Sequence, residues 1–284
     1  MLNTWWFNVI AYLVAFTIFN QAFKFATKKS KKDGALAVLL ELLGGLFILV
    51  AAPFFNFAFP SDIRPYLFLG LACVFYAVAD RANITARRGL EVSTFSILAQ
   101  FNTVFVILWG FIFFKEAFIW QKIVGAVVLI AGNALALYKK GQKFKLDKYV
   151  LFSLLGNLAL SIGISIDVGI SGQFNLPIYV AITLILPALM IFVAERIKPK
   201  EIAAEFKHGN KPAIFLVGIF WGLQILFMLR SYQFGSIIAT APTLALTTII
   251  NVFAGYFLLK EKSSLLQKVI AAIIVIGGIV LINI

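Results

Sequence analysis

Residues 35–55 read ALAVLLELLGGLFILVAAPFF, an apolar run in which Glu41 is the one ionisable residue. A helix needs about 20 predominantly apolar residues to cross the hydrocarbon core of a bilayer. A lipid-facing strand needs only about 9–11 residues, and its side chains alternate in polarity. Because helices and closed barrels alone satisfy the backbone inside lipid, this long unbroken run predicts a membrane-spanning helix.

Nine further runs have the same character. The first half of the chain adds 5–23, 66–86, 92–114 and 118–138, and the second half adds 149–170, 176–195, 213–233, 237–259 and 265–283. The run at 5–23 lacks a basic n-region, so we expect a retained first span rather than a cleaved signal peptide. The predicted fold class is an all-α integral membrane protein with ten transmembrane helices.

The composition supports a membrane protein and narrows the possible chemistry. Of the 284 residues, 62% are hydrophobic and 13% are charged, and the charged share is about half that of a soluble domain. The chain has one cysteine, Cys73, so an intrachain disulfide is excluded. It has one histidine, His208, which excludes most zinc sites and most chemistry with a histidine base. We therefore expect no enzyme, no catalytic residue, no metal and no cofactor.

The basic residues predict how the chain is oriented. The net charge is +13, and the Lys and Arg residues form short clusters between the apolar runs. This clustering indicates membrane topology, with the lipid bilayer as partner and no nucleic acid. The odd-numbered loops hold almost all of these residues, so the positive-inside rule places these loops in the cytoplasm and both termini outside. We expect a multi-pass protein of the cell membrane, of the prokaryotic inner-membrane type.

Two parts of the chain, half its length apart, repeat a pattern. The first copy reads Phe114-Lys115-Glu116, Gln121-Lys122 and Ile130-Ala131-Gly132. The second copy reads Leu259-Lys260-Glu261, Gln267-Lys268 and Ile276-Gly277-Gly278. Each Lys-Glu pair lies between two long apolar runs. The repeat predicts two related units, 1–140 and 141–284, each with five spans.

Five is an odd number, so the second unit enters the membrane in the opposite sense to the first. Inverted repeats of this kind are typical of secondary transporters, because exchanging the conformations of the two halves converts an outward-open state into an inward-open one. A gene duplication without a transport role would leave the same pattern.

This paired pattern resembles the EamA family of the drug/metabolite transporter superfamily, and the resemblance covers the whole chain. Asn20 followed by Lys24 is also similar to the family's first helix, although the usual Trp-Gly is missing there. The resemblance implies a secondary carrier, commonly an exporter of amino acids or other small metabolites. It also implies a central cavity lined mainly by the third, fourth, eighth and ninth helices.

Ionisable residues inside spans are costly and are candidates for function. Glu41, Asp80 and Asp167 are the carboxylates that we expect to carry a coupled proton or sodium ion. For Asp80, an interfacial ion pair with Arg81 is an equal alternative. For Glu41, a bond to a neighbouring helix is as plausible as a role with the substrate.

Polar and aromatic residues on the expected cavity helices are the candidates for substrate binding. They are Tyr76, Asp80, Gln100, Asn102, Trp221, Gln224 and Asn251. Amides donate and accept hydrogen bonds, which suits polar metabolites, and the aromatic rings can stack on a substrate or hold a cation. The alternative is that the amides only join helices to one another. Pro242 frees backbone groups in the ninth span, and the resulting kink would serve gating or packing.

The function predicted from these features is secondary transport, in the direction of export, of an amino acid or a related small metabolite by alternating access. The chain has no Gly-x-x-x-x-Gly-Lys-Ser/Thr loop, so it does not hydrolyse ATP itself. The alternatives are a multi-pass channel or a lipid flippase, and an intramembrane enzyme comes last because the spans hold no nucleophile, base or metal set.

Overall fold

A computed structural model describes residues 4–102, 105, 109, 120–137, 147–235, 240, 243–260 and 264–283. All regular elements in these ranges are helices. The helices of the first half are α1 (Trp5–Lys28), α2 (Asp33–Leu49), α3 (Arg64–Gly89), α4 (Val92–Leu98) and α6 (Trp120–Leu137). The helices of the second half are α7 (Lys148–Ile170), α8 (Leu176–Ala194), α9 (Pro199–His208), α10 (Lys211–Phe234), α12 (Thr247–Leu258) and α13 (Leu265–Asn283). Two short 3₁₀ turns, η1 (Ala52–Phe54) and η2 (Ser171–Gln173), follow α2 and α7.

Six of these helices are long and apolar enough to cross a membrane: α1, α2 with η1, α3, α7 with η2, α8 and α10. Three shorter apolar helices cover Ile123–Leu135, Thr243–Leu258 and Leu265–Leu281. Large apolar side chains remain exposed on the outer faces, for example Leu67 at 65% and Phe257 at 70%. Such exposure is unfavourable in water and favourable in lipid, which fits an all-α membrane protein.

The helix starts follow from local sequence. The Asp147 carboxylate accepts hydrogen bonds from the N–H groups of Tyr149 and Val150, and the Asn175 and Asn210 side chains cap α8 and α10 in the same way. These caps satisfy N–H groups that have no partner within the first helical turn. The predicted starts at 149, 176 and 213 therefore lie within two residues of the observed ones.

The predicted spans and the described helices agree in part. Of the span predicted at 92–114, the structure describes α4 and a few residues after it, so its crossing of the membrane remains a prediction. The Lys-Glu pair of the first copy lies outside the described residues. Helix α9 was not predicted, because its sequence PKEIAAEFKH is too polar for a span and reads as a loop.

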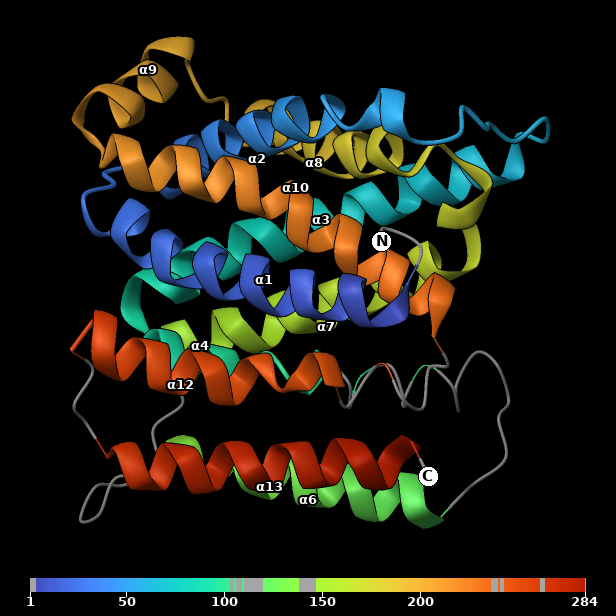
Figure 1. Cartoon of the computed structure of the whole chain (residues 1–284). Coiled ribbons are helices and arrows are strands. Elements are labelled where there is room, and N and C mark those ends of the chain that lie inside the picture. Colours follow the sequence, from blue (N-terminus) through green and yellow to red (C-terminus); the bar gives the residue numbers. More distant parts are fainter. Residues whose placement is uncertain are drawn as a thin grey trace.

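The long helices run side by side, and the most extensive contacts join the two predicted units (Figure 1). Helix α1 packs against α10, and α3 packs against α7. Helix α2 packs against α8, α4 against α12, and α6 against α13. The units 1–140 and 141–284 are thus interleaved rather than separate globular bodies.

Glycines allow close approach at two helix contacts, one between α2 and α10 and one between α6 and α13. A Cβ atom on Gly222 of α10 would lie 3.1 Å from the carbonyl oxygen of Gly44 on α2. A Cβ atom on Gly278 of α13 would lie 2.7 Å from the carbonyl oxygen of Gly125 on α6. Small residues let membrane helices approach in this way, because backbone meets backbone without intervening side chains.

The predicted basic loops meet at one end of the bundle, where polar contacts join them. The ammonium group of Lys24 at the end of α1 donates hydrogen bonds to the carbonyls of Arg87, Arg88 and Leu90 at the end of α3. Arg88 pairs with Asp33 at the start of α2, at 2.8 Å. Carbonyls at a helix C-terminus lack partners within the helix, so a lysine there satisfies them and matches the helix dipole.

Helix α9 is attached at the same end. The Glu205 carboxylate accepts hydrogen bonds from the backbone N–H groups of Lys31 and Lys32, at 3.0 and 2.8 Å. Glu201 pairs with the Lys32 ammonium group at 2.9 Å. The pKa of Glu201 lies below its ordinary value because the Lys198 backbone N–H and Lys32 both stabilise the charged carboxylate.

Candidate functional site

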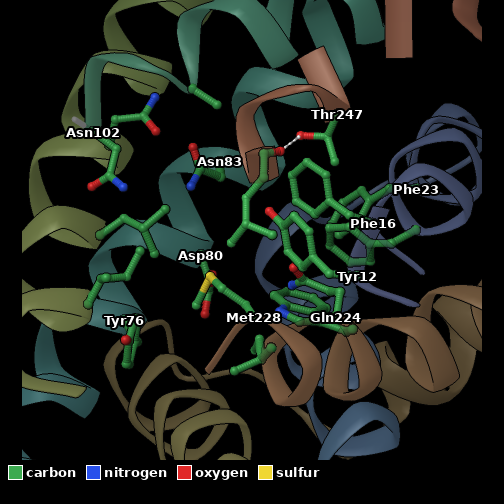
Figure 2. A pocket seen from close by; sticks show the side chains of 18 of the residues that line it. Tyr12, Phe16, Phe23, Tyr76, Asp80, Asn83, Asn102, Gln224, Met228 and Thr247 are labelled. Atoms are coloured by element: carbon green, nitrogen blue, oxygen red, sulfur yellow. Dashed lines mark hydrogen bonds between the residues drawn. The ribbon is translucent and has the colours of Figure 1, made fainter. Parts of the chain in front are cut away.

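A cavity of about 230 Å³ lies between the two units. Its lining comes from α1, α3, α4, α7, α8 and α10 and from the residues just before α12 together with Thr247 at its start. Figure 2 shows the α1 residues Tyr12, Phe16 and Phe23 together on one side, and Asn83 and Asn102 on another. The cavity has the amphipathic character of a small-molecule site.

Helix α3 contributes one complete face to the cavity. Tyr76, Asp80, Asn83 and Arg87 all line it. Their spacing of four, three and four residues places them on one side of a helix with 3.6 residues per turn. The face therefore presents a hydroxyl, a carboxylate, an amide and a guanidinium in succession along about three turns.

Two glycines on α7 make room for this face. A Cβ atom on Gly163 would lie 2.7 Å from a ring carbon of Tyr76. A Cβ atom on Gly156 would lie 2.5 Å from the Asn83 side-chain oxygen. The glycines are seven residues apart on α7, and the side chains that they accommodate are seven residues apart on α3. Because the helices are antiparallel, the two contacts are two turns apart and Asp80 lies between them.

Asp167 on α7 is held by two tyrosines. Tyr76 and Tyr179 each donate a hydroxyl hydrogen bond to it, one to each carboxylate oxygen, at 2.6 Å. Asp167 is 1% exposed. This group joins α3, α7 and α8, and it fixes the ring of Tyr76 at the cavity wall.

Arg87 is buried at the end of the cavity that is nearer the basic loops. Its guanidinium carbon lies 4.0 Å from the ring centre of Phe95 and 4.8 and 5.1 Å from those of Phe23 and Phe19. It also donates a hydrogen bond to the side-chain oxygen of Asn20. Three aromatic faces and an amide oxygen are favourable surroundings for a desolvated cation.

Six of the seven predicted substrate-binding residues line the cavity: Tyr76, Asp80, Gln100, Asn102, Trp221 and Gln224. The amide of Gln100 also donates to Thr248 of α12 at 3.0 Å. The seventh, Asn251, is not part of the lining; it accepts a hydrogen bond from Gln21 of α1 at 3.3 Å. In the structure, Asn251 thus has the helix-joining contact of the alternative interpretation.

The three carboxylates proposed for ion coupling have different surroundings. Asp80 and Asp167 line the cavity. Glu41 on α2 is fully buried outside the lining, and neither of its oxygens has a hydrogen-bond partner in the described part of the chain. Pro242, the predicted gating residue, lies outside the described residues. Arg81 pairs with Glu195, not with Asp80.

Sequence reasoning missed several lining residues. Arg87 was counted among the loop charges because Arg88 and Gly89 follow it, and nothing local shows that three Phe rings from α1 and α4 cover it. The α1 residues Tyr12 and Phe16 were also missed, although aromatics four residues apart on one helix face were a usable signal. The lining also draws on α1, α7 and α8, beyond the four helices that the family resemblance implies.

Comparison with known proteins identifies the fold and no family. No family model matches the chain, and no curated protein matches it. Among solved structures, 19 chains match. One of them, described only as "Crystal structure of protein", has a TM-score of 0.56 and 14% sequence identity, over 96% of this chain and 95% of that chain. The helical arrangement is therefore one that occurs in an experimental structure over nearly its full length.

Proposed function

We propose that this protein is a secondary transporter that exports a small organic metabolite, an amino acid or a related compound, by alternating access. The proposal includes ten spans in two inverted five-helix units, as in the EamA family that the sequence resembles. The basic end faces the cytoplasm, both termini lie outside, and a proton or sodium gradient, or the gradient of the cargo itself, drives transport. The observation that carries the proposal is an amphipathic cavity lined by helices of both units.

The pairing of the helices also supports inverted units. If the five spans of each unit are numbered in order, α1 and α10 are the first and third, and α3 and α7 are the third and first. The pairs α2–α8, α4–α12 and α6–α13 join spans of equal number. A two-fold axis that exchanges the units maps this set of pairs onto itself, which is the relation that alternating access uses.

The contacts at the basic end are consistent with a closed gate on that side. Lys24 joins α1 to the end of α3, and Arg88 at the end of α3 pairs with Asp33 at the start of α2. Lys268 of α13 pairs with Glu91, which precedes α4. These polar contacts lie beyond Arg87 and can exchange with water when the units rock. A carrier needs such a reversible closure on each side of its cavity.

Counterflow in proteoliposomes tests the proposal. Purified full-length protein is reconstituted, loaded with each of a panel of unlabelled amino acids and amines, and assayed for uptake of the same labelled compound. We expect saturable counterflow for at least one compound. Gln224→Ala, in the cavity, should lower it, and Gln233→Ala, exposed on the same helix, should not. Flux that is linear in concentration and without counterflow would instead identify a channel and overturn the proposal.

A further inference from the structure

The charged groups of the cavity differ in whether protein atoms already engage them. Both oxygens of Asp167 accept tyrosine hydrogen bonds, and Arg87 is enclosed by three Phe rings and Asn20. Asp80, which is half-buried and lines the cavity, has no hydrogen bond or ion pair with any residue that the structure describes. Among the described lining residues, Asp80 is thus the charged side chain that remains for a ligand.

Two amide oxygens of lining residues are, like the Asp80 carboxylate, hydrogen-bond acceptors. The side-chain oxygens of Asn83 and Asn102 are buried and have no hydrogen-bond partner among the residues that the structure describes. Both residues line the cavity, and Asn83 lies one turn beyond Asp80 on α3. A carboxylate only accepts hydrogen bonds, and leaving a buried acceptor unpaired is destabilising. A ligand that donates hydrogen bonds and carries a positive charge would satisfy the Asp80 carboxylate, whereas the Asn83 oxygen is turned toward Gly156 of α7.

One wall of the cavity is rich in aromatic rings (Figure 2). Tyr12 and Phe16 are stacked with ring centres 5.3 Å apart, and Trp221 lies 5.3 Å from Phe19 and 5.6 Å from Phe23. Such a wall binds an apolar or aromatic body, and its faces also attract a cation. The volume of about 230 Å³ limits the ligand to a small molecule.

We infer that the cavity recognises its cargo through a protonated amino group bound to Asp80, with the apolar body of the cargo against the aromatic wall. This rests on the proposed function and specifies which group of the cargo is bound. An anionic cargo fits less well, because it would meet the Asp80 carboxylate. Arg87, seven residues and about 10.5 Å of helix rise from Asp80, has its faces covered by aromatic rings.

Binding of two probes that share a body but differ in charge tests the inference. The probes are 2-phenylethylamine and 3-phenylpropionate, and affinity is measured by calorimetry on the purified full-length chain in detergent. We expect the amine to bind and the carboxylate to bind at least tenfold more weakly. Asp80→Asn should weaken amine binding at least tenfold. Asp62→Asn, the same change on an exposed residue outside the cavity, should leave it unchanged.

A further variant guards against misfolding. Asp80→Glu keeps the charge and should restore at least part of the amine affinity that Asp80→Asn loses, with both proteins eluting as the wild type does in size exclusion. Absence of amine binding, equal or tighter binding of 3-phenylpropionate, or unchanged amine affinity in Asp80→Asn would overturn the inference.

Failure of the inference and failure of the proposed function give different results. Amine binding through Asp80 without counterflow would refute transport and leave the site intact. Counterflow that Asp80→Asn leaves unchanged, by protein that does not bind the amine, would refute the site and leave transport intact.

Discussion

Gly163→Ala tests how closely α7 supports the cavity face of α3. The added Cβ atom would lie 2.7 and 2.8 Å from two ring carbons of Tyr76, whereas carbon atoms in contact prefer about 3.5–4.0 Å. The ring must therefore withdraw by about 1 Å. Its hydroxyl is 2.6 Å from Asp167, so this movement takes the pair beyond hydrogen-bonding distance.

The expected cost combines three contributions. Overpacking costs about 1–3 kcal/mol, and the lost hydrogen bond costs about 1 kcal/mol. Alanine returns about 1 kcal/mol through its better helix propensity. The net destabilisation is about 1–3 kcal/mol, which corresponds to a fall in melting temperature of about 5 °C.

The assay is thermal unfolding of the purified protein in detergent, followed by tryptophan fluorescence. Gly169→Ala on the same helix is the matched control, because a Cβ atom there meets nothing within 4 Å. It should be neutral or slightly stabilising. In the Gly163→Ala background, Tyr76→Phe should cost little more, because the bond to Asp167 is already lost. Equal melting temperatures for the two alanine variants would refute the reasoning.

Three further predictions concern other parts of the molecule. Asn251→Ala should lower the melting temperature, because the Gln21 amide loses its acceptor, while cargo affinity in calorimetry stays unchanged. Arg87→Lys should destabilise the protein by about 1–2 kcal/mol in the same thermal assay, because an ammonium group lacks the planar contact with three rings; unchanged stability would contradict this. The pKa of Glu201 is lowered by the hydrogen bond from the Lys198 backbone N–H and by Lys32, so these contacts stabilise the protein above the ordinary carboxyl pKa of 4.5 and are lost as pH falls through the lower folded value. Intrinsic-rate-corrected hydrogen exchange of α9 should therefore rise at acid pH, and Glu201→Gln should show exchange that is already raised at neutral pH.

Much of the helical framework was predictable because a bilayer demands long apolar runs. The runs at 149–170, 176–195 and 213–233 have observed counterparts, and their starts lie next to the Asp and Asn caps, which are local signals. Helix α9 was not predictable by the same rule. The helix is held by hydrogen bonds to the Glu205 carboxylate. Their donors are the backbone N–H groups of Lys31 and Lys32, which lie more than 170 residues away in the sequence.

The site was predictable to the extent that polarity inside a span is unusual. Gln100, Asn102 and Gln224 were identified in this way, because each is an amide in an apolar run and each lines the cavity. The same signal selected Asn251, which bonds to Gln21 instead, since position along a span does not specify which way a side chain faces. Arg87 was missed because burial of an arginine depends on long-range packing.

Alternate exposure of the cavity to the two sides of the membrane is the central claim, and single-cysteine labelling tests it most directly. The one native cysteine, Cys73, is buried. The test protein carries Cys73→Ala, which removes this thiol, and Gln224→Cys, which places a single thiol in the cavity. A membrane-impermeant maleimide is applied to right-side-out and to inside-out vesicles. The account predicts labelling from both sides, with cargo changing the two rates in opposite directions. Labelling from one side only, with and without cargo, would contradict it.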